Sequence, residues 1–190
     1  MRSIILAFVL SVLVLVATTP LVRAAPPAVG EKAPDFALQT LHGKTVRLSE
    51  LTSRGRVVLI VLRGYPGYQC PFCNRQAQDF VQESQAFAQG GAHVVMVYPG
   101  PPQDLRTRAK EFVADKALPS HFDLLLDPGY EFTNLYGVRW DAPRETAYPS
   151  TFLINRDGIV FFARISKGHG GRTTAKEILR ELAKQNAGQR

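Results

Sequence analysis

The sequence predicts an α/β domain with a central mixed sheet flanked by helices, and three features of the chain support this prediction. Residues 57–62 are six consecutive apolar residues rich in β-branched types, which is typical of a strand buried on both faces. The periodicity changes at residue 73, and between residues 77 and 88 the apolar residues recur at steps of three and four, which predicts an amphipathic helix over 73–88. Near the C-terminus two apolar runs flank Asp157-Gly158, which indicates a hairpin. Strand–helix units followed by a hairpin predict parallel strands first and an antiparallel pair last.

The other elements follow in chain order. A Pro/Ala linker at residues 25–29 leads into an entry segment with a turn at 42–44, and Gly90-Gly91 stops the amphipathic helix. Thr174 and Glu177 form a capping box that opens the last helix. The remaining expected elements are strands at 46–48, 93–98, 122–126, 151–154 and 159–165, a helix at 104–116 and a helical turn at 131–136.

Composition and charge limit the class of protein. The chain has 190 residues, of which 45% are hydrophobic and 21% charged, and this suits one globular domain with a short extension. The formal net charge is +7, but the basic residues are spread along the chain without a run or an interleaved aromatic stripe. We therefore expect a solvated basic surface and no nucleic-acid partner.

Residues 1–24 have the pattern of a secretory signal peptide. Arg2 precedes an apolar run at 4–17, and Val22 and Ala24 stand at positions −3 and −1 of a cut after Ala24. The run is shorter than the roughly 20 apolar residues that span a bilayer, and an uncleaved N-terminal anchor is the alternative. We expect an exported protein, periplasmic or secreted, with residues 25–190 as its domain and no stable membrane insertion after cleavage. Its dithiol would then meet an oxidising compartment.

The two cysteines of the chain stand in Cys70-Pro71-Phe72-Cys73, between the strand at 57–62 and the following helix. This spacing has three interpretations. Half of a zinc site would need two further ligands, and the histidines are scattered singly. A structural disulfide over so short a loop would add little stability. A redox-active dithiol is the third, because a sulfur at a helix N-terminus becomes a thiolate more readily. The spacing favours this third interpretation.

The residues around the tetrapeptide add to this prediction. Pro71 suits the first turn of a helix, and Pro149 stands where a proline is tolerated at the start of a strand. Residues 168–172 lack the Gly-Lys-Ser/Thr ending of a phosphate loop, so we interpret them as a flexible loop before the last helix. Between Glu50 and Asp79 no acidic residue occurs, and cations without anions lower the pKa of a thiol. The same window holds four arginines: Arg54, Arg56, Arg63 and Arg75.

With these residues in place, the chain resembles the redoxin family (alkyl hydroperoxide reductase/thiol-specific antioxidant) of the thioredoxin-like superfamily. The resemblance runs over nearly all of residues 25–190 and implies a thioredoxin-like fold and a thiol-dependent oxidoreductase. We expect no cofactor and, since further ligands are missing, no metal. It lies in short motifs that follow one another at the family's spacing: Gly-Glu-Lys-Ala-Pro-Asp-Phe-Ala-Leu at 30–38, Leu-Ser-Glu-Leu at 48–51, Leu-Asp-Pro at 126–128, Tyr-Gly-Val at 136–138, Phe-Leu-Ile at 152–154 and Asp157-Gly158.

Two chemistries compete within this family. Peroxiredoxins resemble Pro-x-x-x-Thr-x-x-Cys, and here Pro66 is followed by Cys70 in the threonine position and by Cys73 in the peroxidatic position. That alignment implies that Cys73 attacks a small peroxide and Cys70 resolves the product. The arginine that precedes the final Ser-Thr-Phe-Leu-Ile strand in many peroxiredoxins is replaced by Pro149, and Arg144 is not at that position.

Both departures move toward the thioredoxin pattern, in which a dithiol faces a cis-proline. That pattern implies that Cys70, as the more exposed cysteine, attacks a protein disulfide and Cys73 resolves the mixed disulfide. Tyr148, Pro149 and Pro66 would then border the substrate. We favour disulfide exchange with protein disulfide or thiol clients and an external thiol donor, in antioxidant redox work, over peroxidase activity. A non-catalytic binding module with a structural Cys70–Cys73 disulfide is the remaining alternative.

Overall fold

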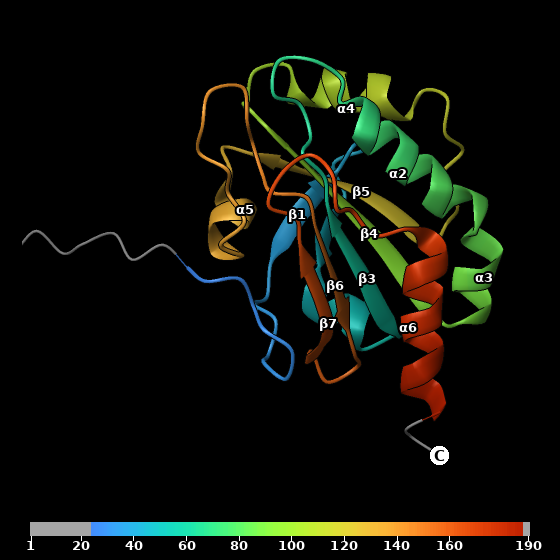
Figure 1. Ribbon diagram of the computed structural model, residues 1–190. Helices are drawn as coiled ribbons and strands as arrows, with labels where there is room; N and C mark the ends of the chain where they lie inside the picture. Colours follow the sequence, from blue (N-terminus) through green and yellow to red (C-terminus); the bar gives the residue numbers. More distant parts are fainter. Residues whose placement is uncertain (1–23, 188–190) are drawn as a thin grey trace, which may run out of the picture.

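Three parallel strands form the centre of the sheet: β3 (Arg56–Val61), β4 (Ala92–Gly100) and β5 (Phe122–Pro128). The computed structural model describes residues 24–187 (Figure 1). Alternate residues of β3 enter two separate hydrophobic cores, one on each face of the sheet. This arrangement explains why the strand is apolar at every position rather than at every second one.

Antiparallel strands complete both edges of the sheet. β6 (Ser150–Ile154) pairs with β3, and β7 (Val160–Ile165) pairs with β6, as predicted for the C-terminal hairpin. At the other edge β1 (Ala37–Thr40) pairs with β5 and with β2 (Thr45–Arg47), which gives the order β2-β1-β5-β4-β3-β6-β7. The sequence did not predict β1, because only one of its residues is buried and it carries no apolar run.

Helices cover both faces of the sheet, and the larger group lies on the face that carries the cysteines (Figure 1). This group is α2 (Pro71–Gln82), α3 (Ser84–Gln89), α4 (Leu105–Val113) and α6 (Ala175–Ala187). The opposite core receives α1 (Leu48–Thr52) and α5 (Glu131–Leu135). The architecture is therefore the predicted thioredoxin-like α/β sandwich.

Two elements differ from the prediction. The single helix expected at 73–88 is broken at Glu83, whose ψ of 15° leaves the helical range, so that α2 and α3 are separate. The stacked rings of Phe80 and Phe87, with centroids 5.4 Å apart, keep both helices on one core and preserve the apolar spacing across the break. Leu48 begins α1 instead of ending a strand. The predicted cap of α6 is present, since the amide of Glu177 donates to Thr174 Oγ1 at 3.3 Å.

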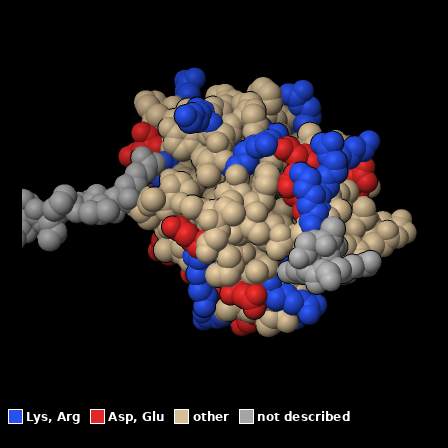
Figure 2. Space-filling view, turned by 60° about the horizontal axis from the view of Figure 1, so that its bottom comes forward, with Lys and Arg blue, Asp and Glu red and all other residues tan. Residues whose placement is uncertain are grey.

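The surface carries charges of both signs. On the face shown in Figure 2, cationic and anionic side chains lie close together around a broad uncharged area. No helix within residues 24–187 is long and apolar enough to cross a membrane. The predicted signal peptide falls outside the described residues except for Ala24.

Candidate active site

The dithiol lies between β3 and α2, in the connection that follows the carboxyl end of β3. Cys70 is the N-cap of α2 and Pro71 its first residue, so the predicted position at a helix N-terminus is confirmed. The preceding Gln69 holds this corner in place. Its Oε1 accepts a hydrogen bond from Tyr98 at 2.9 Å, and its Nε2 donates to the carbonyl of Arg108 at 2.8 Å.

The two cysteines are buried alike but differ in their acidity. Cys70 is 1% exposed and Cys73 0%, so the expectation that Cys70 is the more exposed rests on a very small difference. A hydrogen bond from Cys73, together with the charge of Arg172 and a contact from Arg63, outweighs burial and lowers the pKa of Cys70 to about 5. Burial, then the bond to Cys70, raises the pKa of Cys73. At neutral pH Cys70 is therefore a thiolate and Cys73 a thiol.

Arg172 reaches Cys70 from the loop between β7 and α6. Its Nη2 is 3.9 Å from Cys70 Sγ, and its Nη1 donates to Gln76 Oε1 at 3.0 Å. The loop at 168–172, which the sequence predicts to be flexible, is joined to α2 through the hydrogen bond of Arg172 to Gln76. No sequence pattern indicates the contact of Arg172 with Cys70, because 102 positions separate the two residues.

Arg63 is the one of the four sequence-adjacent arginines that the structure brings to Cys70. It is only 3% exposed, and its Nε donates to Glu145 Oε2 at 2.5 Å. Glu145 Oε1 also accepts a hydrogen bond from His169 Nε2 at 2.9 Å. Burial would raise the pKa of Glu145, but the hydrogen bonds from Arg63 and His169 lower it. The neighbourhood therefore does contain an anion, supplied by a residue far from the cysteines in sequence.

Aromatic side chains border the same corner. Trp140 stacks on Tyr148 with ring centroids 4.6 Å apart and lies 5.3 Å from the ring of His169. Phe72 is 41% exposed and Tyr68 44%. Exposed aromatic groups beside reactive sulfurs form a surface suited to an apolar or peptide substrate.

Of the three predicted substrate-bordering residues, Tyr148 joins this aromatic group. Pro66 lies half-buried in the loop before Cys70. Pro149 is buried at the start of β6, and its carbonyl accepts the amide of Ser166 at 2.8 Å. The register of β6 with β3 pairs Ser150 with Val61.

The expectation of a cis-proline at Pro149 is wrong, since no peptide bond within residues 24–187 is cis. The amide of Tyr148 donates to the carbonyl of Val138 at 2.8 Å, and Ala147 bridges to Arg139. These contacts keep the chain extended as it enters β6, and the trans form suits that course. The peptide before Pro149 is therefore an ordinary trans peptide.

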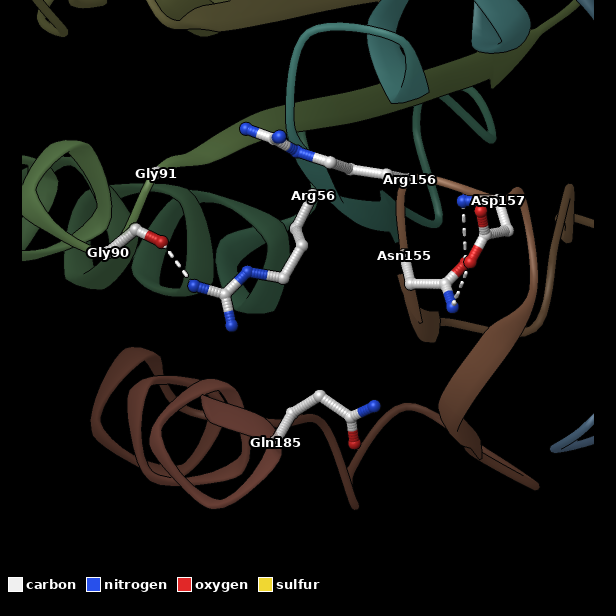
Figure 3. A pocket seen from close by; sticks show the side chains of 7 residues that line it. All are labelled: Arg56, Gly90, Gly91, Asn155, Arg156, Asp157 and Gln185. Atoms are coloured by element: carbon white, nitrogen blue, oxygen red, sulfur yellow. Dashed lines mark hydrogen bonds between the residues drawn. The ribbon is translucent and has the colours of Figure 1, made fainter. Parts of the chain in front are cut away.

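No group of three or more His, Cys, Asp or Glu side chains that could hold a metal occurs in the part of the chain that the structure describes. A hollow of about 460 Å³ lies at the opposite end of the sheet, beside the first residue of β3 (Figure 3). Its Arg56 donates to the carbonyls of Gly90 and Leu182, at 3.0 Å for Leu182. This arginine ties α3 to α6 and takes no part in the dithiol site.

Known proteins resemble the chain in sequence and in fold. The AhpC/TSA family model matches residues 29–163. Peroxiredoxin Bcp of Bacillus subtilis is 32% identical over 68% of this chain and 80% of its own length. The thiol-disulfide oxidoreductase ResA of Halalkalibacterium halodurans is 28% identical over 83% of this chain and 78% of its own length. The crystal structure of peroxidoxin BcpB from Mycobacterium tuberculosis superposes with a TM-score of 0.64 at 25% identity, covering 85% of this chain and 97% of that one.

Proposed function

Since the chain belongs to the AhpC/TSA family and is a thiol-dependent oxidoreductase, we propose that it performs thiol-disulfide exchange with Cys70 as the attacking sulfur. The observation that carries the proposal is the inequality of the two cysteines. Cys70 is the N-cap of α2, and Arg172 lies 3.9 Å from its sulfur. Cys73 lies one turn deeper and is completely buried. Disulfide exchange requires one ionised sulfur that attacks the client and a second sulfur close by that resolves the mixed disulfide.

The exchange proceeds in two steps that conserve atoms and electrons. The Cys70 thiolate attacks one sulfur of a client disulfide, forms a mixed disulfide and releases the other client sulfur as a thiolate. Cys73 then loses its proton to that leaving thiolate and attacks Cys70 Sγ. The second client sulfur leaves as a thiolate, and a Cys70–Cys73 disulfide forms. The client has gained two electrons from the enzyme and one proton from Cys73, its second sulfur takes a proton from water, and an external thiol donor reduces the enzyme again.

Peroxide reduction is the second candidate, and the 32% identity to peroxiredoxin Bcp favours it. In this reaction a thiolate attacks the peroxide and becomes a sulfenic acid, which the other thiol condenses to a disulfide with loss of water. The motif alignment gives the attack to Cys73. The raised pKa of Cys73 supports disulfide exchange instead, because the attacking group must be a thiolate.

Single-cysteine variants separate these functions. We expect Cys70→Ser to abolish insulin reduction. We expect Cys73→Ser to retain the first step and to accumulate a mixed disulfide that non-reducing electrophoresis detects. If Cys73→Ser abolishes peroxide consumption while Cys70→Ser retains one turnover, the protein is a peroxidase. If the unaltered reduced protein turns over neither substrate, the binding module with a structural disulfide is the correct interpretation.

The site of action belongs to the same proposal. The signal pattern of residues 1–24 supports export to the periplasm or the medium. The clients are protein disulfides or thiols, and the exposed Phe72 and Tyr68 supply apolar contact area beside the sulfurs.

A further inference from the structure

The loop between β7 and α6 supplies the dithiol with a cation that none of the motifs contains. We propose that Arg172 is a catalytic residue that pairs with the Cys70 thiolate, and that Gln76 is its positioning residue. This inference deepens the proposed function, since it takes Cys70 as the sulfur that attacks and later leaves.

The guanidinium of Arg172 is held by all three of its nitrogens. Nη2 faces Cys70 Sγ at 3.9 Å, Nη1 donates to Gln76 Oε1 at 3.0 Å, and Nε donates to the carbonyl of His169 at 3.1 Å. The group is thus fixed in the orientation that directs one N–H pair at the sulfur, so little rotamer freedom is lost when the thiolate forms.

The charge of Arg172 is not neutralised by a carboxylate. Arg63 also lies near Cys70, but it forms an ion pair with Glu145. Arg172 forms no ion pair with an acidic side chain of residues 24–187, and its partners are an amide, a carbonyl and the sulfur. Of the two arginines, Arg172 is therefore the one whose full charge acts on the thiolate.

Gln76 fixes the loop to the helix that carries the dithiol. It is 7% exposed on α2, and its Nε2 donates to the carbonyl of Thr173 at 3.2 Å while its Oε1 accepts from Arg172. The hydroxyl of Thr173 is hydrogen bonded to that of Thr151 on β6 at 2.8 Å. The loop is thereby attached to a helix and to a strand, and Arg172 cannot move away from Cys70 without breaking these bonds.

The cation acts at both steps of the exchange. It favours the Cys70 thiolate at pH values where a free thiol is protonated. It also makes Cys70 a better leaving group during re-reduction, when a second donor thiol attacks the donor sulfur of the Cys70–donor mixed disulfide, because a thiol of lower pKa leaves faster. Removing the charge raises the pKa of Cys70 and slows its reactions most at low pH.

The test measures the rate of Cys70 alkylation by iodoacetamide against pH on the reduced protein, with the labelled cysteine located by mass spectrometry. For Arg172→Gln we expect a midpoint shifted upward by about one unit, hence a rate about fivefold lower at pH 5 and close to that of the unaltered protein at pH 9. Arg172→Lys should recover part of the shift. Lys167→Gln is the matched control, because it removes an exposed cation of the same loop that has no contact with Cys70.

Gln76→Leu separates positioning from charge. It leaves the arginine in place but removes its anchor, and we expect a smaller shift of the midpoint in the same direction. An unchanged midpoint in Arg172→Gln overturns the proposal, and so does an equal shift in Lys167→Gln. A loss of rate by the same factor at every pH indicates a structural role only and also overturns it. Alkylation needs no client, so this outcome is independent of whether insulin reduction fails.

Discussion

At Cys70 a hydrogen bond from Cys73 and the charge of Arg172 favour the thiolate, whereas at Cys73 burial favours the thiol. Both residues are nearly or completely buried, so exposure does not assign their roles. The difference in acidity arises from the hydrogen bond between the two cysteines, which lowers the pKa of Cys70 and raises that of Cys73, together with the burial of Cys73. The acidity of this site is therefore set by groups on the loop after β3, on α2 and on the loop before α6 together.

The shift at Cys70 has a consequence for stability. Its pKa is about 5 in the folded protein and 9.0 as a reference thiol, so between these values the folded state binds fewer protons than the unfolded state. A depressed pKa gives stability that is fully present above about pH 9 and is lost as the pH falls through about 5. We predict that the free energy of unfolding of the reduced protein, relative to Cys70→Ala, increases from pH 5 to pH 8.

Urea unfolding at pH 5 and pH 8, with a reductant present, measures this difference. Cys73 is retained in both proteins, so most of its own titration cancels. A difference that is the same at both pH values would contradict an ionised Cys70 in the folded state.

The sequence predicts that the tetrapeptide stands at a helix N-terminus, but it does not predict the charged residues that lie near its sulfurs. Cys70, Pro71 and Cys73 lie within one turn, so local spacing is sufficient to place them. Glu145 and Arg172 reach the site through the packing of loops, and no pattern in their own neighbourhoods marks them. The cis form that the thioredoxin pattern implies for Pro149 is absent from residues 24–187, and the residues beside Pro149 do not distinguish the two forms.

At the scale of elements, long apolar runs were predicted well and short edge elements were not. β3 and β4 are buried along nearly all of their length, and such strands show in sequence as continuous apolar runs. β1 and α1 take their structure from neighbours, and β1 has only one buried residue. The apolar side predicted for the helix at 73–88 is the side that packs on the core, but the segment forms two helices instead of one. Apolar spacing indicates which side of a helix is buried, and it does not indicate a break such as that at Glu83.

The loop that carries the dithiol depends on one glycine. Gly64 has a φ of +69°, and a β-carbon there would collide with the backbone carbonyl of Pro99, which already accepts the amide of Tyr65 at 2.9 Å. Gly67 in the same loop has a φ of +107° but open space around it. Both positions carry the strain of a left-handed backbone on substitution, and only Gly64 adds a steric clash.

We therefore predict that Gly64→Ala lowers the free energy of unfolding by more than 2 kcal/mol and Gly67→Ala by about 1 kcal/mol. Chemical denaturation of the reduced proteins measures both values. Because Gly64 anchors the start of the loop, its variant should also slow Cys70 alkylation at pH 7, and Gly67→Ala should not. Equal destabilisation by the two substitutions would show that backbone strain, and not the contact with Pro99, limits this position.

At the scale of the whole molecule the redox site and the hollow lie at opposite ends of the same sheet. The hollow in Figure 3 is bordered by the start of β3 and the turn after β6, while the dithiol follows the end of β3. Arg56 joins the C-terminal end of α3 to α6 there through the backbone carbonyls of Gly90 and Leu182. One end of the fold therefore serves to hold the helices on the sheet, and the other end carries the chemistry.

Export is the whole-molecule property on which the proposed function depends, because the compartment decides whether the dithiol is kept oxidised or must be reduced by a donor. We predict that the full chain, expressed in a Gram-negative host, is cleaved after Ala24. The product should be recovered in the periplasmic fraction with Ala25 as its first residue. The measurements are the intact mass of the protein and its N-terminal sequence.

The control for this prediction is Leu13→Arg, which places a charge in the apolar run at 4–17 and should leave the chain uncleaved in the cytoplasm. The cut itself is compatible with the fold, because the residues on both sides of it, Ala24 and Ala25, are exposed. Recovery of the full-length chain in the membrane fraction would indicate the uncleaved anchor, with the redox domain still exported. Full-length protein in the cytoplasm would contradict export, and the dithiol would then work in a reducing compartment, where a role in reducing clients or peroxide is favoured over one in oxidising them.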